Sequence, residues 1–167
     1  MDTVWVVGTG MTTFGRHDNR TTGELLGWAV HDALADAEAA PEVVDVVYHG
    51  SATQGLLQGQ HMIAGQIAVR SLGIEAVPVH NVENACATGA SAFNLAVTHV
   101  RGGAADVALA VGVEKMHIGD PARSMAVFDT GFEVADPDAL QRTLVELSWA
   151  LQLPKVVAGY EQSKAQR

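Results

Sequence analysis

The chain has 167 residues, of which 48% are hydrophobic, and a formal net charge of −9. This composition fits a single domain with a core and excludes a disordered chain. The acidic balance offers nucleic-acid phosphates little to bind, and no apolar run approaches the roughly 20 residues of a membrane span, so we expect neither partner. No basic signal-peptide region opens the chain, and its single cysteine favours a reducing compartment, which predicts a cytoplasmic protein.

The first part of the sequence alternates between strand and helix patterns. Residues 3–8 are apolar and β-branched, which predicts a buried strand. Thr21 or Thr22 is expected to cap a helix that has Glu24 in its first turn and ends before Pro41. Residues 43–50 predict a second strand, and residues 61–73 predict a helix that Gly73 terminates.

Two further strands are predicted at residues 77–82 and 106–114, with a helix over residues 87–103 between them. One side of that helix carries Ala90, Phe93, Val97 and Val100. Strands that alternate with helices predict an α/β fold with a mostly parallel sheet over residues 1–116.

Residues 117–167 have a different character and form a second predicted region. Residues 116–134 show no period and are expected to be a loop. Residues 136–154 predict one helix, with Asp136 as its N-cap and Pro137 as its first residue. The apolar stripe of this helix consists of Leu140, Leu144, Leu147 and Leu151.

Glycines follow the first predicted strand, but they do not form a dinucleotide-binding fingerprint. The fingerprint needs a small residue three places after Gly10, and that position is Thr13. Gly8, Gly10 and Gly15 are therefore expected to serve a turn that requires positive φ angles.

The histidines show no metal-binding spacing, and no second cysteine is present to complete a zinc site, so we predict no metal. His31 and His99 are expected on helix surfaces. His49 and His80 lie in or at the ends of predicted strands, and a structural role is favoured for both over a place in a cleft.

Cys86 stands in the stretch VENACATGAS, between a predicted strand and a predicted helix. The positive end of a helix stabilises a thiolate, and the Cys86 N–H is placed to face an oxyanion that forms on an attacked thioester. The small residues from Ala87 to Ser91 would let a substrate approach closely. The residues alone leave two interpretations open: a nucleophile, or a small buried side chain, because free cysteine is often buried.

The stretch NVENACATGASAFNLAVTHVRGGAADVALAVGVEKM (81–116) resembles the nucleophile segment of thiolases, in particular of the sterol-carrier-protein type. Residues 6–16 and 55–74 resemble the opening of that subfamily and the region before its catalytic strand. The likeness covers residues 3–117. It implies a thiolase-like layered βαβαβ half in which Cys86 is the catalytic nucleophile. The C-terminal helical and loop extension after residue 116 follows from the sequence pattern alone, because the resemblance ends there.

The resemblance also implies a substrate and partners. The substrate would be a coenzyme A thioester, with no bound cofactor, and no residue is assigned to coenzyme A. The second half of a thiolase carries an Asn-Glu-Ala-Phe segment, a Gly-His-Pro histidine and a Cys-x-Gly acid/base cysteine, and none of these motifs occurs in this sequence. Residues 78–84, near the catalytic strand, are expected at a dimer interface.

Three functions are open at this stage. The first is a thiolase-like acyltransferase half that works in 3-ketoacyl-CoA thiolysis or Claisen condensation. It would act as a homodimer or with a complementary chain that supplies the missing histidine and cysteine. The second is a non-catalytic module that binds a partner or an acyl-CoA. The third, a ketoacyl-synthase-like condensing protein, is disfavoured by the Glu-Lys-Met ending after the fourth strand.

Overall fold

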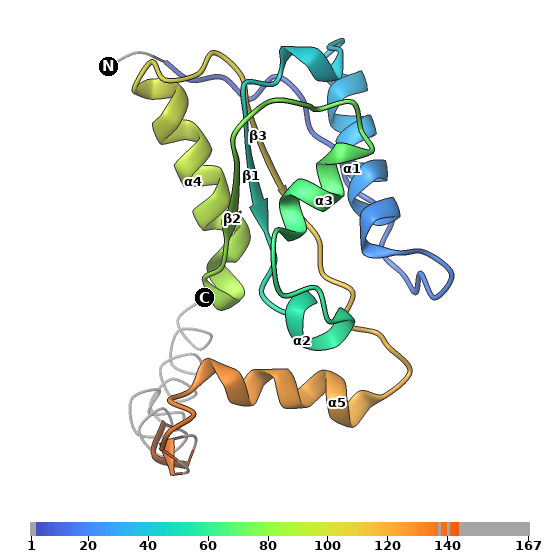
Figure 1. Ribbon diagram of the computed structural model, residues 1–167, viewed down its shortest axis with the longest axis vertical. Coiled ribbons are helices and arrows are strands. Elements are labelled where there is room, and N and C mark those ends of the chain that lie inside the picture. Colours follow the sequence, from blue (N-terminus) through green and yellow to red (C-terminus); the bar gives the residue numbers. More distant parts are fainter. Residues whose placement is uncertain (1–2, 137, 140, 144–167) are drawn as a thin grey trace, which may run out of the picture. The chain divides into compact units, whose positions relative to one another are not determined.

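The computed structural model describes residues 3–136, 138, 139 and 141–143, and it divides the chain into two units, residues 1–124 and 125–167. Three parallel strands form the sheet of the first unit: β1 (Val46–Gly50), β2 (Val79–Val82) and β3 (Ala108–Gly112). Their order is β2–β1–β3 (Figure 1). The predicted α/β fold with a parallel sheet is therefore confirmed.

Helices cover both faces of this sheet. Helices α1 (Thr22–Asp36) and α3 (Ala64–Arg70) pack on one face, and α4 (Thr88–Arg101) packs on the other (Figure 1). The central strand β1 is buried along its whole length. Because side chains of a strand alternate between its faces, Val47 joins the core under α1 and α3, whereas Val46 and Tyr48 join the core under α4.

Helix α1 begins where the sequence predicts. The Thr21 hydroxyl accepts a hydrogen bond from the Glu24 N–H at 3.1 Å, and the Glu24 carboxylate accepts one from the Thr21 N–H at 2.7 Å. This reciprocal capping box satisfies two backbone donors of the first turn. The bond from the Thr21 backbone is also the main reason that the pKa of Glu24 lies below its usual value.

Two short helices lie outside the predicted helices. Helix α2 (Gln54–Gln58) lies between β1 and α3, and α5 (Pro121–Ala126) lies within the predicted loop 116–134. Short 3-10 helices span Pro41–Val43, Ala85–Ala87 and Val127–Gly131. No helix in the described part of the chain is long and apolar enough to cross a membrane.

The C-terminal predictions fall mostly outside the described residues. Most of the predicted helix 136–154 lies there, and so does its whole stripe (Leu140, Leu144, Leu147 and Leu151). The predicted domain boundary after residue 116 stays a prediction.

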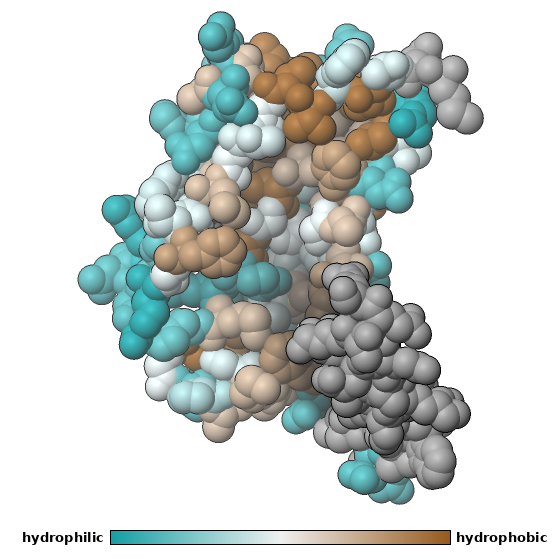
Figure 2. Space-filling model, turned by 180° about the vertical axis from the view of Figure 1, so that it is seen from behind, coloured by the Kyte–Doolittle hydropathy of each residue, from teal (hydrophilic) through white to brown (hydrophobic). Residues whose placement is uncertain are grey.

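Residues 3–8, which are predicted to form a buried strand, form no strand in the structure. The segment is extended but pairs with no strand among the described residues, and Trp5, Val6 and Val7 are more than 60% exposed. Figure 2 views the molecule from the side opposite to Figure 1, and hydrophobic side chains gather on the upper part of the face that it shows. The apolar pattern that predicts a strand is present, but a strand forms only where a neighbour supplies hydrogen bonds.

The expected role of the first glycines is also wrong. Gly8, Gly10 and Gly15 are not among the residues with positive φ. A Cβ atom at Gly8 would lie 2.2 Å from the Ala33 carbonyl oxygen, and one at Gly10 would lie 2.1 Å from that of Ala29. Gly8 and Gly10 are therefore needed because the segment passes directly against the backbone of α1.

Three of the histidines, His49, His80 and His99, pack against the sheet or its helices. His99 is half-buried rather than on the surface, because its Nδ1 lies 2.6 Å from the Tyr48 hydroxyl. The Tyr48 ring stacks on His80, with the ring centroids 4.9 Å apart. His49 is only 1% exposed and packs beneath α3, where a Cβ at Gly65 would lie 2.6 Å from the Cβ of His49.

Burial lowers the pKa of His49 below its ordinary value of 6.5, against the opposing influence of Glu114 and the Asn81 side chain. As the pH falls below about 6.5, His49 therefore takes up a proton more readily in the unfolded chain than in the folded chain. The free energy of unfolding decreases as a result. We expect the free energy of unfolding to decrease between pH 7 and pH 5, by at most about 1.4 kcal/mol per pH unit from this group. Urea unfolding at several pH values measures the slope.

The His49→Gln variant should lose this part of the slope, because glutamine does not titrate. The matched control is His31→Gln, at an exposed position of α1, which should keep the wild-type slope. Equal slopes for the wild type and His49→Gln would contradict the assignment.

Candidate active site

The loops that follow the three strands meet at one edge of the sheet. The strands are parallel and end at Gly50, Val82 and Gly112, so their carboxyl ends lie together. Open parallel sheets bind their ligands at this edge. Cys86 lies in the loop after β2, in the 3-10 turn Ala85–Ala87 that leads into α4, and it is exposed. The alternative of a small buried side chain is therefore wrong.

Thr88 holds this turn in place from below. It is 7% exposed, and its hydroxyl accepts a hydrogen bond from the Asn84 N–H at 2.8 Å and donates one to the Ala85 carbonyl at 2.7 Å. The Ala87 N–H closes the turn by donating to the Asn84 carbonyl at 2.8 Å. The Asn84 side chain also donates to the Ser91 hydroxyl at 2.9 Å. These bonds fix the backbone on both sides of Cys86.

The residue before Cys86 has a strained conformation. Ala85 has a φ of +44°, in the left-handed region that side chains with a Cβ rarely adopt. Such a residue costs on the order of 1–3 kcal/mol and persists only where its surroundings impose it. Here the Thr88 hydroxyl and the Glu83 carboxylate, which accepts from the Ala85 N–H at 2.6 Å, hold the peptide groups on either side.

Close packing places the turn directly over the end of the central strand. A Cβ at Gly50 would lie 2.9 Å from the Thr88 methyl group. The absence of a side chain at Gly50 therefore allows the first residue of α4 to approach the last residue of β1. The N-cap position of α4, Ala87, offers no side-chain hydrogen bond, so no side chain at that position caps the positive end of the helix near Cys86.

Two charged residues after β3 fasten the neighbouring loops. The Glu114 carboxylate accepts hydrogen bonds from the Ser51 and Thr53 hydroxyls and from the N–H groups of Ala52 and Thr53. The Lys115 ammonium donates to the carbonyls of Asp18 and Arg20, at 3.2 and 2.5 Å. In the sequence, Glu114 and Lys115 stand out only through the resemblance to thiolases. An acidic residue directly after a buried strand is the signal that would have suggested such a role.

Within residues 3–136 and the few described residues after them, no base is hydrogen-bonded to Cys86. Among the described residues no hydrogen bond joins its thiol to a histidine or another basic side chain. His49 lies buried beneath α3, and His80 stacks on Tyr48. Within the same residues no three His, Cys, Asp or Glu side chains are grouped as metal ligands would be. The site thus consists of an exposed thiol on a fixed turn at the start of a helix.

Two solved structures have a partial likeness to this fold. A 3-oxoacyl-[acyl-carrier-protein] synthase III from Aquifex aeolicus matches 57% of this chain and 30% of its own, with 19% identity and a TM-score of 0.47. A tetronic acid condensing enzyme matches 52% of this chain and 26% of its own, with 27% identity and a TM-score of 0.46. Both TM-scores are below 0.5, so the likeness is limited.

Curated relatives are more similar in sequence. Human sterol carrier protein 2 is 38% identical over 119 residues, which are 70% of this chain and 21% of the relative. An acetyl-CoA acetyltransferase of Methanocaldococcus jannaschii is 39% identical over 116 residues, 70% of this chain and 29% of the relative. The benzoylsuccinyl-CoA thiolase subunit BbsB of Thauera aromatica is 38% identical over 116 residues, 66% of this chain and 28% of the relative.

The chain thus spans less than a third of the length of these relatives. The family described as the N-terminal domain of thiolase matches residues 4–146, which include all three strands and the turn around Cys86. The chain therefore belongs to the thiolase family, and it matches the N-terminal domain of that family.

Proposed function

We propose that this chain is the nucleophile-bearing half of a thiolase-type acyltransferase, in which Cys86 accepts an acyl group from a coenzyme A thioester. The observation that supports this most is the exposed Cys86 thiol on a strained, hydrogen-bonded turn at the start of α4, within a thiolase N-terminal domain. A reducing compartment keeps a single exposed thiol free of disulfides, which is the reason for placing the proposed activity in the cytoplasm.

The proposed step is an acyl transfer between two sulfur atoms. The Cys86 thiol loses its proton, and the thiolate attacks the thioester carbonyl carbon. A bond forms between that carbon and the Cys86 Sγ, the bond to the coenzyme A sulfur breaks, and coenzyme A leaves as a thiolate that takes up a proton. The backbone N–H groups at the start of α4 are suited to stabilising the oxyanion that forms between these events.

No basic side chain among the described residues is hydrogen-bonded to Cys86, so in this chain alone the exposed thiol loses its proton to solvent before it attacks. The curated relatives include an acetyl-CoA acetyltransferase and a benzoylsuccinyl-CoA thiolase subunit, which supports a coenzyme A thioester as the substrate class. In the proposal a C-terminal thiolase half supplies the histidine and the second cysteine for thiolysis or condensation. Strand β2 supports the proposed interface at residues 78–84, because it is an edge strand with exposed His80 and Asn81.

A second candidate is a non-catalytic thiolase-like module that binds an acyl-CoA or a partner. The observation in its favour is the lack of a base hydrogen-bonded to Cys86 among the described residues. The two candidates differ in whether Cys86 ever carries an acyl group.

Incubation of the purified chain with a panel of acyl-CoA thioesters tests the proposal. We expect intact-mass spectrometry to show a gain equal to one acyl group on the wild type and no gain on Cys86→Ser. Iodoacetamide should alkylate Cys86 in a parallel sample, because the thiol is exposed. Alkylation without acylation would favour the module for this chain alone, and the absence of both would rule out the nucleophile.

The turn around Cys86 should depend on the Thr88 hydroxyl. Replacing Thr88 by Val keeps the shape of the side chain but leaves the partly buried Asn84 N–H without its acceptor, at a cost of about 1–3 kcal/mol. We expect a lower melting temperature and slower acylation of Cys86. The control is Thr98→Val, since the Thr98 hydroxyl donates only within the exposed part of α4. Equal effects of both variants would show that Thr88 has no special role.

A further inference from the structure

The Glu83 side chain folds back onto the turn that carries Cys86. Glu83 follows directly after β2, and its Oε1 accepts a hydrogen bond from the Ala85 N–H at 2.6 Å. Among the described residues no salt bridge joins this carboxylate to a basic side chain. The role of the Glu83 carboxylate must therefore be sought in the turn itself.

Two hydrogen bonds fix the conformation of Ala85 from opposite sides. Its N–H is held by the Glu83 carboxylate, and its C=O accepts a bond from the Thr88 hydroxyl at 2.7 Å. The φ and ψ angles of a residue are the rotations between these two peptide groups, so holding both groups sets both angles. Ala85 stays at a φ of +44° because it is held in this way, since a residue with a Cβ atom otherwise relaxes to negative φ.

The conformation of Ala85 decides where the Cys86 N–H points. The Ala85 C=O and the Cys86 N–H belong to one planar trans peptide group, so they point in opposite directions. Thr88 is buried below the turn, and the carbonyl that contacts it therefore points inward. The Cys86 N–H consequently points outward.

The Cys86 N–H is also free to donate. The N–H groups of Asn84, Ala85 and Ala87 in the same turn all have acceptors, at 2.6 to 2.8 Å. In the part of the chain that the structure describes, the Cys86 N–H donates to no acceptor. It is thus available to an oxyanion that forms on an acyl group attacked by the thiol.

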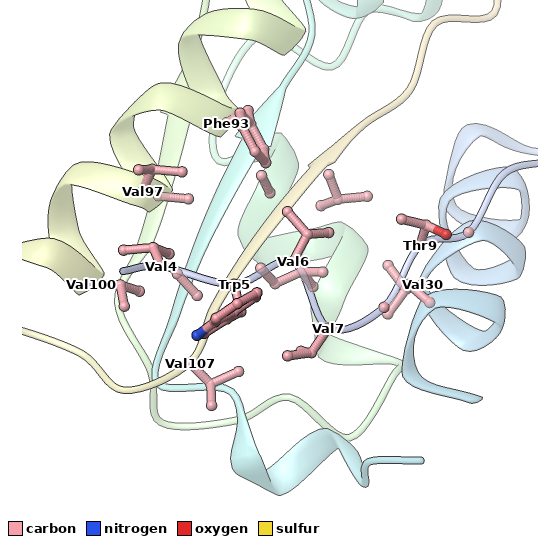
Figure 3. Close-up of a pocket in the computed structure, with 18 of the residues that line it drawn as sticks. Val4, Trp5, Val6, Val7, Thr9, Val30, Phe93, Val97, Val100 and Val107 are labelled. Atoms are coloured by element: carbon pink, nitrogen blue, oxygen red, sulfur yellow. The ribbon is translucent and has the colours of Figure 1, made fainter. Parts of the chain in front are cut away.

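Cys86 lies outside the open groove beside β3. This groove has a volume of about 770 Å³ and is lined by residues 3–10, α1, α4 and β3 (Figure 3), but not by Cys86. An oxyanion at the exposed thiol would therefore form near the surface of this chain. A donor stabilises such a charge best when its direction is set before the reaction, because no reorganisation is then needed.

We propose that Glu83 is a positioning residue, which holds the Ala85 N–H, keeps Ala85 in the left-handed conformation and so keeps the Cys86 N–H aimed at the oxyanion. The inference rests on the proposed function, since it assigns a role in the same acyl transfer. The carboxylate acts here as a hydrogen-bond acceptor and not through its charge, because a negative charge beside a developing oxyanion opposes the reaction. An amide oxygen at this position should therefore serve as well.

Two reactions of Cys86 distinguish the direction of its N–H from the reactivity of its thiol. With p-nitrophenyl acetate, the thiolate attacks the carbonyl carbon and an oxyanion forms; a C–S bond is made, the C–O bond breaks and p-nitrophenolate leaves. With iodoacetamide, the thiolate displaces iodide and no oxyanion forms. The ratio of the acetylation rate to the alkylation rate therefore reports on the N–H, and Cys86→Ser gives the background.

We expect Glu83→Ala to lower this ratio about tenfold and Glu83→Gln to keep it within about threefold of the wild-type value. The control is Glu75→Ala, which removes an exposed carboxylate from the loop before β2 and should leave the ratio unchanged. If Glu83→Ala does not fold, Glu83→Met, which has a similar length and no oxygen, decides in its place. An unchanged ratio in the variant without an acceptor, or an equal loss in Glu83→Gln, would overturn the inference.

The acetylation test does not depend on coenzyme A, because p-nitrophenyl acetate contains none. If acyl-CoA thioesters fail to acylate the wild type but the ratio depends on Glu83 as expected, the proposed function fails for this chain and the role of Glu83 in the turn stands. If acyl-CoA thioesters do acylate Cys86 but the ratio is independent of Glu83, the proposed function stands and this inference fails. Alkylation of the wild type without acetylation would also overturn it.

Discussion

The complete burial of β1 is the constraint on which the rest of the first unit depends. Val46 and Val47 are at most 1% exposed although they point to opposite faces of the sheet, and burial of each side chain stabilises the fold by roughly 1.5–3 kcal/mol. Both faces must therefore be covered by helices. Because parallel strands are joined through crossovers, α3 and α4 run back across the sheet between strands, and all three strands end at the same edge.

The same constraint explains the position of Cys86. Strand β1 ends at Gly50, and the lack of a side chain there lets Thr88 seat the start of α4 against the sheet. The Thr88 hydroxyl then holds the turn that contains the strained Ala85. The thiol is thus presented by rigid elements rather than by a free loop, which is what a nucleophile needs. Glu114 and Lys115 extend this rigidity to the adjacent loops.

Two features of the unit lack a counterpart among the described residues. Cys86 has no hydrogen-bonded base, and the outer edge of β3 has no neighbouring strand. The missing base concerns the reactivity of the thiol at the carboxyl ends of the strands. The missing strand concerns the backbone hydrogen bonds along the outer edge of β3. The two features lie at different places in the unit, since Cys86 does not line the groove beside β3. Both fit a chain that matches less than a third of its relatives' length.

The sequence by itself determined the order of the three paired strands and of α1, α3 and α4, the capping of α1, and the place of Cys86 between a strand and a helix. These features depend on local patterns that one segment carries alone. The tertiary structure decided what depends on neighbours. Residues 3–8 have a strand pattern, but the described part of the chain holds no strand that pairs with them. The apolar stripe of α4 (Phe93, Val97 and Val100) lines an open groove beside β3, and the smaller side chains of Ala92 and Ala96 pack against the sheet instead. Gly8 and Gly10 lack a side chain so that their segment can pass against the backbone of α1, and neither has a positive φ angle. The sequence could not indicate this role, because a contact between distant segments leaves no local pattern.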